Sequence, residues 1–212
     1  MALTSSEEMH KLVRKIAKVD PAFAPIIKSS GLCTINAKRP TRTHYDTLVT
    51  SIISQQLAIK AADTIRERVR LLAGGAIQAE AIAALTPEAL RSAGVSGAKI
   101  RAITELTDGT LSGEIEFKKF SKMSNEAISQ ELTAIWGIGR WTVEMFLMFH
   151  LGRLDLWPVG DLAMRRGWEK IHRLPGYIDP KELDRMGQKF EGMQSVVAWY
   201  CWRATEGESS TW

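Results

Sequence analysis

Apolar residues along the chain recur at the spacing of amphipathic helices. The clearest set follows the i, i+3, i+4, i+7, i+8 pattern of a helix that buries one face: Tyr45, Leu48, Val49, Ile52 and Ile53. Thr43 precedes this set and is a suitable N-cap. We therefore predict a helix that begins after Thr43 and ends near residues 54–56.

Start and stop signals extend the helical pattern to the rest of the chain. Thr86-Pro87-Glu88 combines a capping hydroxyl, a proline at the first helical position and an acidic first turn. Asp179-Pro180 also supplies a cap followed by a proline. The other predicted helices cover about residues 59–72, 97–111, 124–135, 142–149, 162–171 and 193–204. Strand-like alternation is lacking, so the sequence predicts an all-α fold of about ten helices.

Composition places the chain among ordinary globular proteins. Of its 212 residues, 45% are hydrophobic and 25% are charged, which excludes a disordered or collagen-like chain. The net charge of +4 is only a mild bias toward a polyanionic partner. All seven tryptophans lie at or after residue 136, so the aromatic chemistry is concentrated in the C-terminal part.

Cysteine usage and hydropathy exclude several further classes. Cys33 and Cys201 have no second cysteine or histidine at metal-ligand spacing, which excludes a side-chain zinc site and a four-cysteine iron–sulfur cluster. We expect two free thiols in a reducing cytoplasm. No segment approaches about 18 uninterrupted apolar residues, and the first residues lack the apolar stretch of a signal peptide. Membrane insertion and secretion are therefore not expected.

A glycine-containing turn between two apolar-periodic segments is the first candidate for function. It reads Trp136-Gly137-Ile138-Gly139-Arg140 and joins the segments into a helix-hairpin-helix. Amide groups at the start of the second helix point outward at the positive end of the helix dipole, which suits a phosphate. Without a nucleophile or metal ligand, such a turn would position a nucleic acid without reading its sequence. Gly-Ile-Gly alone is also typical of an ordinary glycine-capped turn.

Asp161 is the second candidate. It follows Trp157-Pro158-Val159-Gly160 and opens an apolar helix, so it is predicted to lie at a helix N-terminus in a hydrophobic neighbourhood. An N-capping aspartate is one interpretation. A catalytic carboxylate is the other, since a helix end favours the ionised form while apolar burial opposes it. The two roles are compatible.

The hairpin, the Pro-Val-Gly-Asp loop and the final segment from Ser195 to Arg203 together resemble the helix-hairpin-helix (HhH-GPD) DNA glycosylases, in the compact form of DNA-3-methyladenine glycosylase II. The resemblance covers about residues 45–203. It implies a single unit over residues 1–205 with a cleft between two lobes. Lobe A would span about residues 43–140, and lobe B would span about residues 1–42 and 141–205. Residues 206–212 would form a frayed tail.

The resemblance also implies roles for individual residues. Asp161 would be the catalytic acid, and Trp141, Trp202 and Met145 would line the base pocket. The hairpin residues that hold DNA would be Gly137, Ile138, Gly139, Arg140 and Thr142. The wedge that fills the gap left by a flipped base would come from Gln55, Gln56 and Leu57, with Gln56 as the inserted residue, or Leu57 if the register shifts by one. A second loop at the lesion would comprise Ser96, Gly97 and Lys99.

For several of these residues a structural interpretation stays open. Trp141 and Trp202 could also be core-packing residues. Residues 54–57 could form an ordinary polar turn between helices. Lys99 could be a surface lysine that contacts water instead of a phosphate. We assign the other tryptophans before the tail, Trp136, Trp157, Trp168 and Trp199, to packing. Trp212 has no predicted role.

One position in the hairpin implies the type of reaction. Related enzymes that also cut the strand carry a lysine just after Gly-x-Gly-Arg, because an amine is needed for a Schiff base. Here this position is Trp141. The resemblance therefore implies a monofunctional enzyme that removes alkylated purines such as 3-methyladenine and 7-methylguanine and leaves an abasic site.

The expected partner is double-stranded DNA with alkylated bases. The expected location is the cytoplasm or nucleoid, or the nucleus in a eukaryote. The protein is expected to be a monomer without an obligate protein partner. No metal held by side chains or other cofactor is expected, although the resemblance allows Na⁺ or K⁺ on hairpin carbonyls. Two alternatives stay open: a non-catalytic protein that binds damaged DNA, and a glycosylase for oxidised or deaminated bases.

Overall fold

The computed structural model describes residues 3–206 and shows α-helices and short helical turns joined by loops, with no strand within this range. The described chain divides into two compact units, residues 3–39 with 147–206, and residues 40–146. The division falls between Phe146 and Leu147, so the second hairpin helix belongs to the unit of residues 40–146, whereas the sequence placed it in lobe B. Residues 207–212 of the expected tail, which include Trp212, lie outside the described residues.

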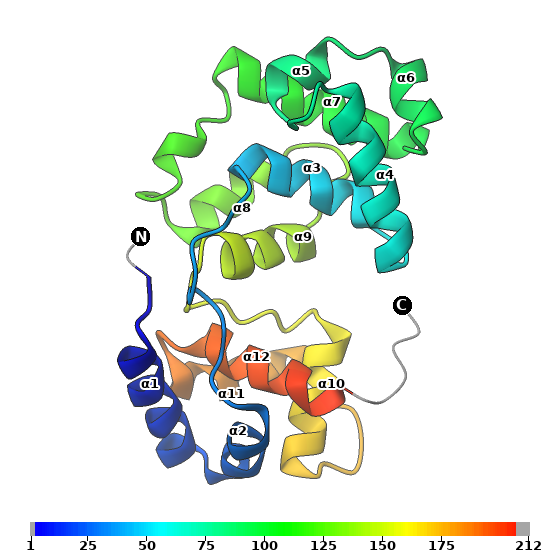
Figure 1. Ribbon diagram of the computed structural model, residues 1–212. Coiled ribbons are helices and arrows are strands. Elements are labelled where there is room, and N and C mark those ends of the chain that lie inside the picture. Colours follow the sequence, from blue (N-terminus) through cyan, green and yellow to red (C-terminus); the bar gives the residue numbers. More distant parts are fainter. Residues whose placement is uncertain (1–2, 207–212) are drawn as a thin grey trace. The chain divides into compact units, whose positions relative to one another are not determined.

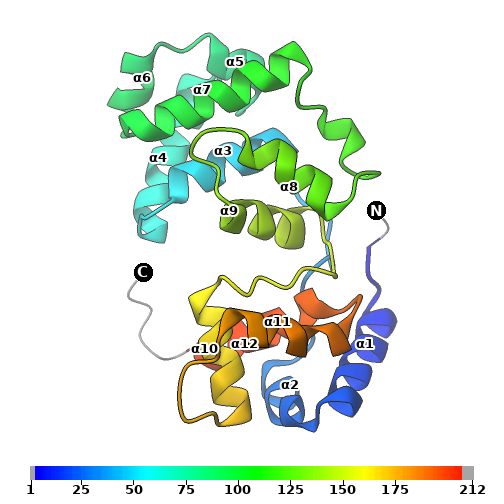
Figure 2. The same ribbon diagram turned by 180° about the vertical axis from the view of Figure 1, so that it is seen from behind.

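Five α-helices make up the described part of the first unit. They are α1 (Ser6–Val19), α2 (Ala24–Ser30), α10 (Leu162–His172), α11 (Pro180–Gly187) and α12 (Gln194–Thr205). Figures 1 and 2 show α10 and α12 side by side, and these two helices form the main packing contact of the unit. Short 3-10 turns at Pro21–Phe23 and Gln188–Phe190 complete it.

The second unit contains the other seven α-helices of the described chain. They are α3 (His44–Ser54), α4 (Ile59–Leu72), α5 (Ala79–Ala83), α6 (Pro87–Ser92), α7 (Gly97–Ser112), α8 (Asn125–Thr133) and α9 (Arg140–Met145). A 3-10 turn lies at Phe117–Lys119, and α9 continues into a π-helical turn at Phe146–His150. No helix within residues 3–206 is both long and apolar enough to cross a membrane.

The helices confirm the predictions drawn from periodicity and caps. All five apolar residues of the first predicted set are buried on α3, and the Thr43 side chain accepts a hydrogen bond from the Asp46 amide. Proline and its cap open both α6 and α11 as expected. Three further helices, α1, α2 and α5, were not predicted individually. For α1 the missed signal was a capping box, in which Ser5 and Glu8 exchange hydrogen bonds.

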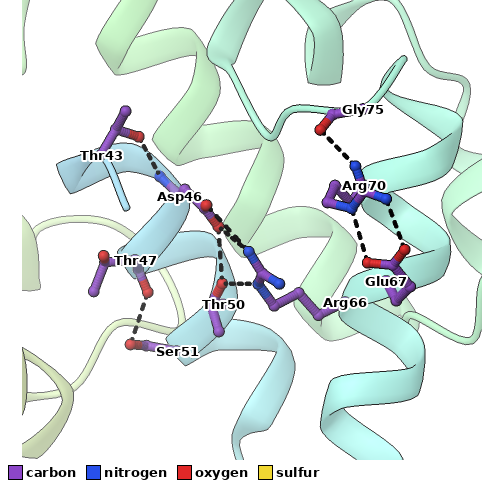
Figure 3. Close-up of polar contacts among 9 residues, drawn as sticks. All are labelled: Thr43, Asp46, Thr47, Thr50, Ser51, Arg66, Glu67, Arg70 and Gly75. Carbon is purple, nitrogen blue, oxygen red and sulfur yellow. Dashed lines mark hydrogen bonds and ion pairs between the residues drawn. The ribbon is translucent and has the colours of Figure 1, made fainter. Parts of the chain in front are cut away.

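A partly buried ion pair fixes α3 against α4. The Arg66 guanidinium donates to both carboxylate oxygens of Asp46, at 3.2 and 3.4 Å, and to the Thr50 hydroxyl at 3.1 Å (Figure 3). Thr50 in turn donates to Asp46 at 3.1 Å. Three polar side chains therefore satisfy one another and hold α3 against α4.

A buried acid connects three parts of the first unit. Asp20 is 8% exposed, and its Oδ2 lies 2.9 Å from both His172 Nε2 on α10 and Lys189 Nζ in the turn before α12. Its Oδ1 accepts from the Ala22 amide. Burial alone would raise the pKa of this carboxyl, but the hydrogen bonds from His172 and Lys189 outweigh it and the pKa is lowered.

The Asp20 contacts predict an acid-dependent loss of stability. Since the folded-state pKa lies below the unfolded value of about 3.9, the stabilisation is complete above that pH and is lost as the pH falls through the folded pKa. We expect Asp20→Asn to lower the free energy of unfolding by about 1 to 3 kcal/mol at pH 6, and the difference from the native protein to shrink toward pH 3. Urea titrations at both pH values measure this. The exposed Asp184→Asn is the matched control, and an equal difference at both pH values would contradict the assignment.

Candidate functional site

The carboxylate of Asp161 is fixed at the start of α10. Asp161 is the N-cap of this helix, and its Oδ1 accepts hydrogen bonds from the Met164 amide at 2.7 Å and from Trp202 Nε1 at 2.9 Å. Its own amide donates to Pro158 O at 2.9 Å, which closes the Pro-Val-Gly-Asp loop. The residue is half-buried. The capping role is thus confirmed, and it leaves an oriented carboxylate at the positive end of a helix dipole.

One aromatic ring contacts this carboxylate, and a second ring packs against the first. Trp202 donates its indole N–H to Asp161, and its ring lies 5.7 Å from that of Phe149, tilted by 39°. Phe149 is 51% exposed. The structure therefore brings together two residues that the sequence singled out, Asp161 and Trp202. It adds Phe149, which sequence analysis missed because it falls in a run of apolar residues typical of a core helix.

A buried serine holds the segment that leads to Asp161. Ser195 is fully buried at the start of α12. Its Oγ accepts from the Leu156 amide at 3.0 Å, and its own amide donates to Leu154 O at 3.0 Å. These bonds fix residues 154–156 along α12, only five residues before Asp161. No motif around Ser195 indicated this role.

The predicted hairpin is present in the second unit. Residues 134–139 join α8 to α9, and Gly137 has a φ of 82°, a left-handed conformation that suits glycine. A Cβ at Gly137 would lie 3.1 Å from the Cβ of Ala102, because α7 packs closely beneath the turn. Gly139 is the N-cap of α9 and has no side chain to cap its amides. The first turn of α9 therefore presents amide groups without a side-chain cap.

The side chains around the hairpin differ in exposure. Trp141 is 54% exposed, as a residue that contacts a ligand would be, and Met145 is half-buried on the same helix. Arg140 is largely exposed and donates to the Glu144 carboxylate at 3.0 Å. Thr142 and Ile138 are buried, so these two support the turn from inside.

Trp136 corrects one prediction. It was assigned to packing, but it is 42% exposed, and the Arg101 guanidinium lies 4.5 Å from its ring centroid. Its backbone amide donates to Glu105 at 2.8 Å. That hydrogen bond and the one from Arg101 lower the pKa of the Glu105 carboxyl. Trp168, by contrast, is 1% exposed and confirms its assignment to packing.

A shallow hollow of about 620 Å³ lies beside the hairpin. It is lined by one charged pair, Arg101 with Glu105, and by residues 133–139. The hollow thus exposes the backbone of the hairpin loop.

The predicted wedge residues form the turn between α3 and α4. Gln56 is exposed and has a φ of 54°, a left-handed conformation that is uncommon for a residue with a Cβ. Leu57 is half-buried, and its amide donates to Ser54 O at 3.2 Å. Gln55 is half-buried, and its amide group donates to Gly137 O at 3.0 Å, which ties this turn to the hairpin.

The second predicted loop lies at the start of α7. Ser96 is the N-cap, and a Cβ at Gly97 would meet no atom within 4 Å, so the backbone there is open to close approach. Lys99 points inward and donates to Ile53 O and to Gln55 O, both at 2.8 Å. Burial lowers the pKa of its ammonium. These bonds give Lys99 a structural role that the sequence did not indicate.

Side chains within residues 3–206 form no group of three or more His, Cys, Asp or Glu that could hold a metal ion. The hairpin carbonyls are the remaining candidate ligands. Those of Ile135, Gly137 and Gly139 each accept a hydrogen bond, from Ile138 N, Gln55 Nε2 and Val143 N. Each carbonyl oxygen has a second lone pair, so these contacts are compatible with a weakly held monovalent cation.

Comparison with known proteins places this geometry in a family. Residues 49–191 match the model of the HhH-GPD superfamily base excision DNA repair proteins. DNA-3-methyladenine glycosylase 1 of Schizosaccharomyces pombe is 31% identical over 210 residues, which cover 94% of this chain and 92% of the relative.

Two solved structures support the same family. A DNA-3-methyladenine glycosidase from Bacillus halodurans is 35% identical with a TM-score of 0.83, over 95% of this chain and 92% of the other. An S. pombe 3-methyladenine DNA glycosylase in complex with abasic DNA is 30% identical with a TM-score of 0.78. The match covers 95% of this chain and 98% of the other. The chain therefore belongs to the HhH-GPD superfamily of base excision DNA repair proteins.

Proposed function

We propose that this protein is a DNA glycosylase that hydrolyses the N-glycosidic bond of alkylated purines in double-stranded DNA and leaves an abasic site. The observation that carries the proposal is the carboxylate of Asp161, oriented by two hydrogen bonds at the start of α10. Further support comes from relatives named DNA-3-methyladenine glycosylase and from the one solved in complex with abasic DNA.

The chemistry of the leaving group explains why one carboxylate suffices. A purine alkylated at N3 or N7 carries positive charge, so when its bond to C1′ breaks, the electron pair leaves with the base and neutralises it. The sugar becomes an oxocarbenium-like cation in the transition state. Asp161 stabilises that cation and takes up the proton of the water that attacks C1′. A strong general acid is not needed.

The position of Trp141 favours a reaction that ends at hydrolysis. Strand cleavage through a Schiff base requires an amine at the position that Trp141 occupies, and an indole cannot supply it. The indoles of Trp141 and Trp202 can instead attract a cationic base through their π faces, with about 0.5 to 2 kcal/mol each. Because the two residues belong to different units, their joint role with Met145 in a base pocket stays a prediction.

DNA binding is assigned to the second unit. The uncapped amides at the start of α9 hold a phosphate, with Gly137 and Gly139 allowing close approach of the backbone. Because the reacting bond is out of reach inside a duplex, the nucleotide is flipped out and Gln56 fills the gap. Na⁺ or K⁺ on the hairpin carbonyls, a monomeric state and Ser96 and Gly97 as lesion contacts are further parts of this proposal.

Incubation of the purified protein with methylated genomic DNA tests the function. We expect release of free 3-methyladenine and 7-methylguanine, with abasic sites that break only after alkali treatment. Defined duplexes with 8-oxoguanine, uracil or hypoxanthine serve as competing substrates. Preferential excision of one of these would indicate a different lesion class. Absence of any released base despite binding to damaged DNA would indicate a non-catalytic protein.

A further inference from the structure

The turn that carries Gln56 is held by a lysine from another helix. The Nζ of Lys99, on the first turn of α7, donates to the carbonyls of Ile53 and Gln55 at 2.8 Å each. Carbonyls at the end of a helix lack partners within the helix and carry the negative end of its dipole, so an ammonium group is well suited there. Lys99 thus closes the end of α3 immediately before Gln56.

The conformation of Gln56 requires such support. Its φ of 54° is unfavourable for a residue with a Cβ, and conformations of this kind persist only where the surroundings enforce them. The carbonyl of the preceding residue, Gln55, is one of the two that Lys99 holds. The position of the exposed Gln56 side chain therefore depends on a partly buried contact that Gln56 itself does not make.

The same turn is bound to the hairpin. Gln55 Nε2 donates to Gly137 O at 3.0 Å and lies 3.5 Å from the Thr142 hydroxyl on α9. Backbone and side chain of Gln55 thus bridge the end of α3, the start of α7 and the hairpin, all within the unit of residues 40–146. The phosphate-holding turn and the inserted residue are thereby kept at a fixed separation.

We propose that Gln55 and Lys99 are positioning residues for base flipping: they couple the Gln56 turn to the hairpin, so that Gln56 enters the duplex at a set distance from the held phosphate. The inference rests on the proposed glycosylase function. A preformed turn needs no ordering when the base leaves the stack. A loosened turn lets the flipped nucleotide return before the bond is hydrolysed.

Removal of either contact should act selectively on paired lesions. We expect Gln55→Met and Lys99→Met, which keep side-chain length but lose the donors, to slow single-turnover release of 7-methylguanine opposite cytosine by about five- to tenfold. Release of the same base opposite a one-nucleotide gap should fall less than twofold, because an unpaired base is flipped at lower cost. Lys99→Arg, which retains several donors, should recover most of the lost rate.

Controls separate positioning from general damage. The exposed Gln130→Met and Lys122→Met carry the same changes of side chain outside this network and should match the native protein on both duplexes. Equal losses on the paired and gapped duplexes in Gln55→Met and Lys99→Met, or no loss on either, would overturn the inference while the native protein stays active. A native protein that releases no base from either duplex would instead refute the proposed function.

Discussion

Replacement of Asp161 by asparagine is expected to abolish most base release while the protein stays folded and bound to DNA. The amide oxygen of asparagine can accept the same two hydrogen bonds, from the Met164 amide and Trp202 Nε1, so the cap of α10 is kept. What is lost is the negative charge that faces the sugar cation. Loss of a preorganised electrostatic group costs about 2.7 to 4 kcal/mol in the transition state, or about a 10²- to 10³-fold lower rate.

Single-turnover release of 7-methylguanine, combined with binding to a duplex that contains an abasic site, measures both halves of this expectation. Asp155→Asn is the matched control, because it removes the same charge from an exposed position six residues earlier. Retention of more than about a tenth of the native rate by Asp161→Asn would remove the assignment of this residue. A parallel loss of binding would point to a structural role instead.

Gly167→Ala is expected to destabilise the packing of α10 against α12. A Cβ at this position of α10 would lie 1.9 Å from the carbonyl oxygen of Cys201 and 2.4 Å from its carbon, both backbone atoms of α12. No side-chain rotation can relieve that overlap, so the two helices must separate by about 1 Å or more to reach ordinary contact. Overpacking of this kind costs about 1 to 3 kcal/mol or more, against about 1 kcal/mol gained from the helix preference of alanine.

The same substitution should lower activity, because Trp202 follows Cys201 on α12 and its hydrogen bond to Asp161 spans the two helices. We expect a melting temperature lower by about 2 to 8 °C and a reduced rate of base release. Gly176→Ala is the control, since a Cβ there meets no atom within 4 Å. A Gly167→Ala protein as stable and active as the control would show that α10 and α12 can separate freely.

Local features of the sequence were sufficient to predict most helices and the two candidate motifs. Helix periodicity and capping depend on residues within a few positions of one another, which is why α3, α4 and α6 begin where expected. The Gly-Ile-Gly hairpin and the capping position of Asp161 are local in the same sense. The helices that were not predicted are short or lie in the first 30 residues.

Contacts between distant residues could not be predicted in this way. Nothing near Lys99 indicates that its ammonium meets two carbonyls at the end of α3, and nothing near Ser195 indicates a bond to residues 154–156. From the sequence alone, Gly167 is a glycine that lowers the helix propensity of α10. The structure shows that a Cβ at this position would overlap the backbone of α12. Each of these roles depends on which helix faces which.

The sequence by itself thus determined where most of the helices form, where the glycine hairpin lies and which aspartate opens a helix. These features depend on short-range hydrogen bonding and apolar periodicity among neighbouring residues. Only the tertiary structure decided that Trp202 orients Asp161 across 41 residues and that Gln55 joins the Gln56 turn to Gly137 across 82. Such pairs form when side-chain burial brings separate helices together, and the identity of the facing helix is a property of the packed chain.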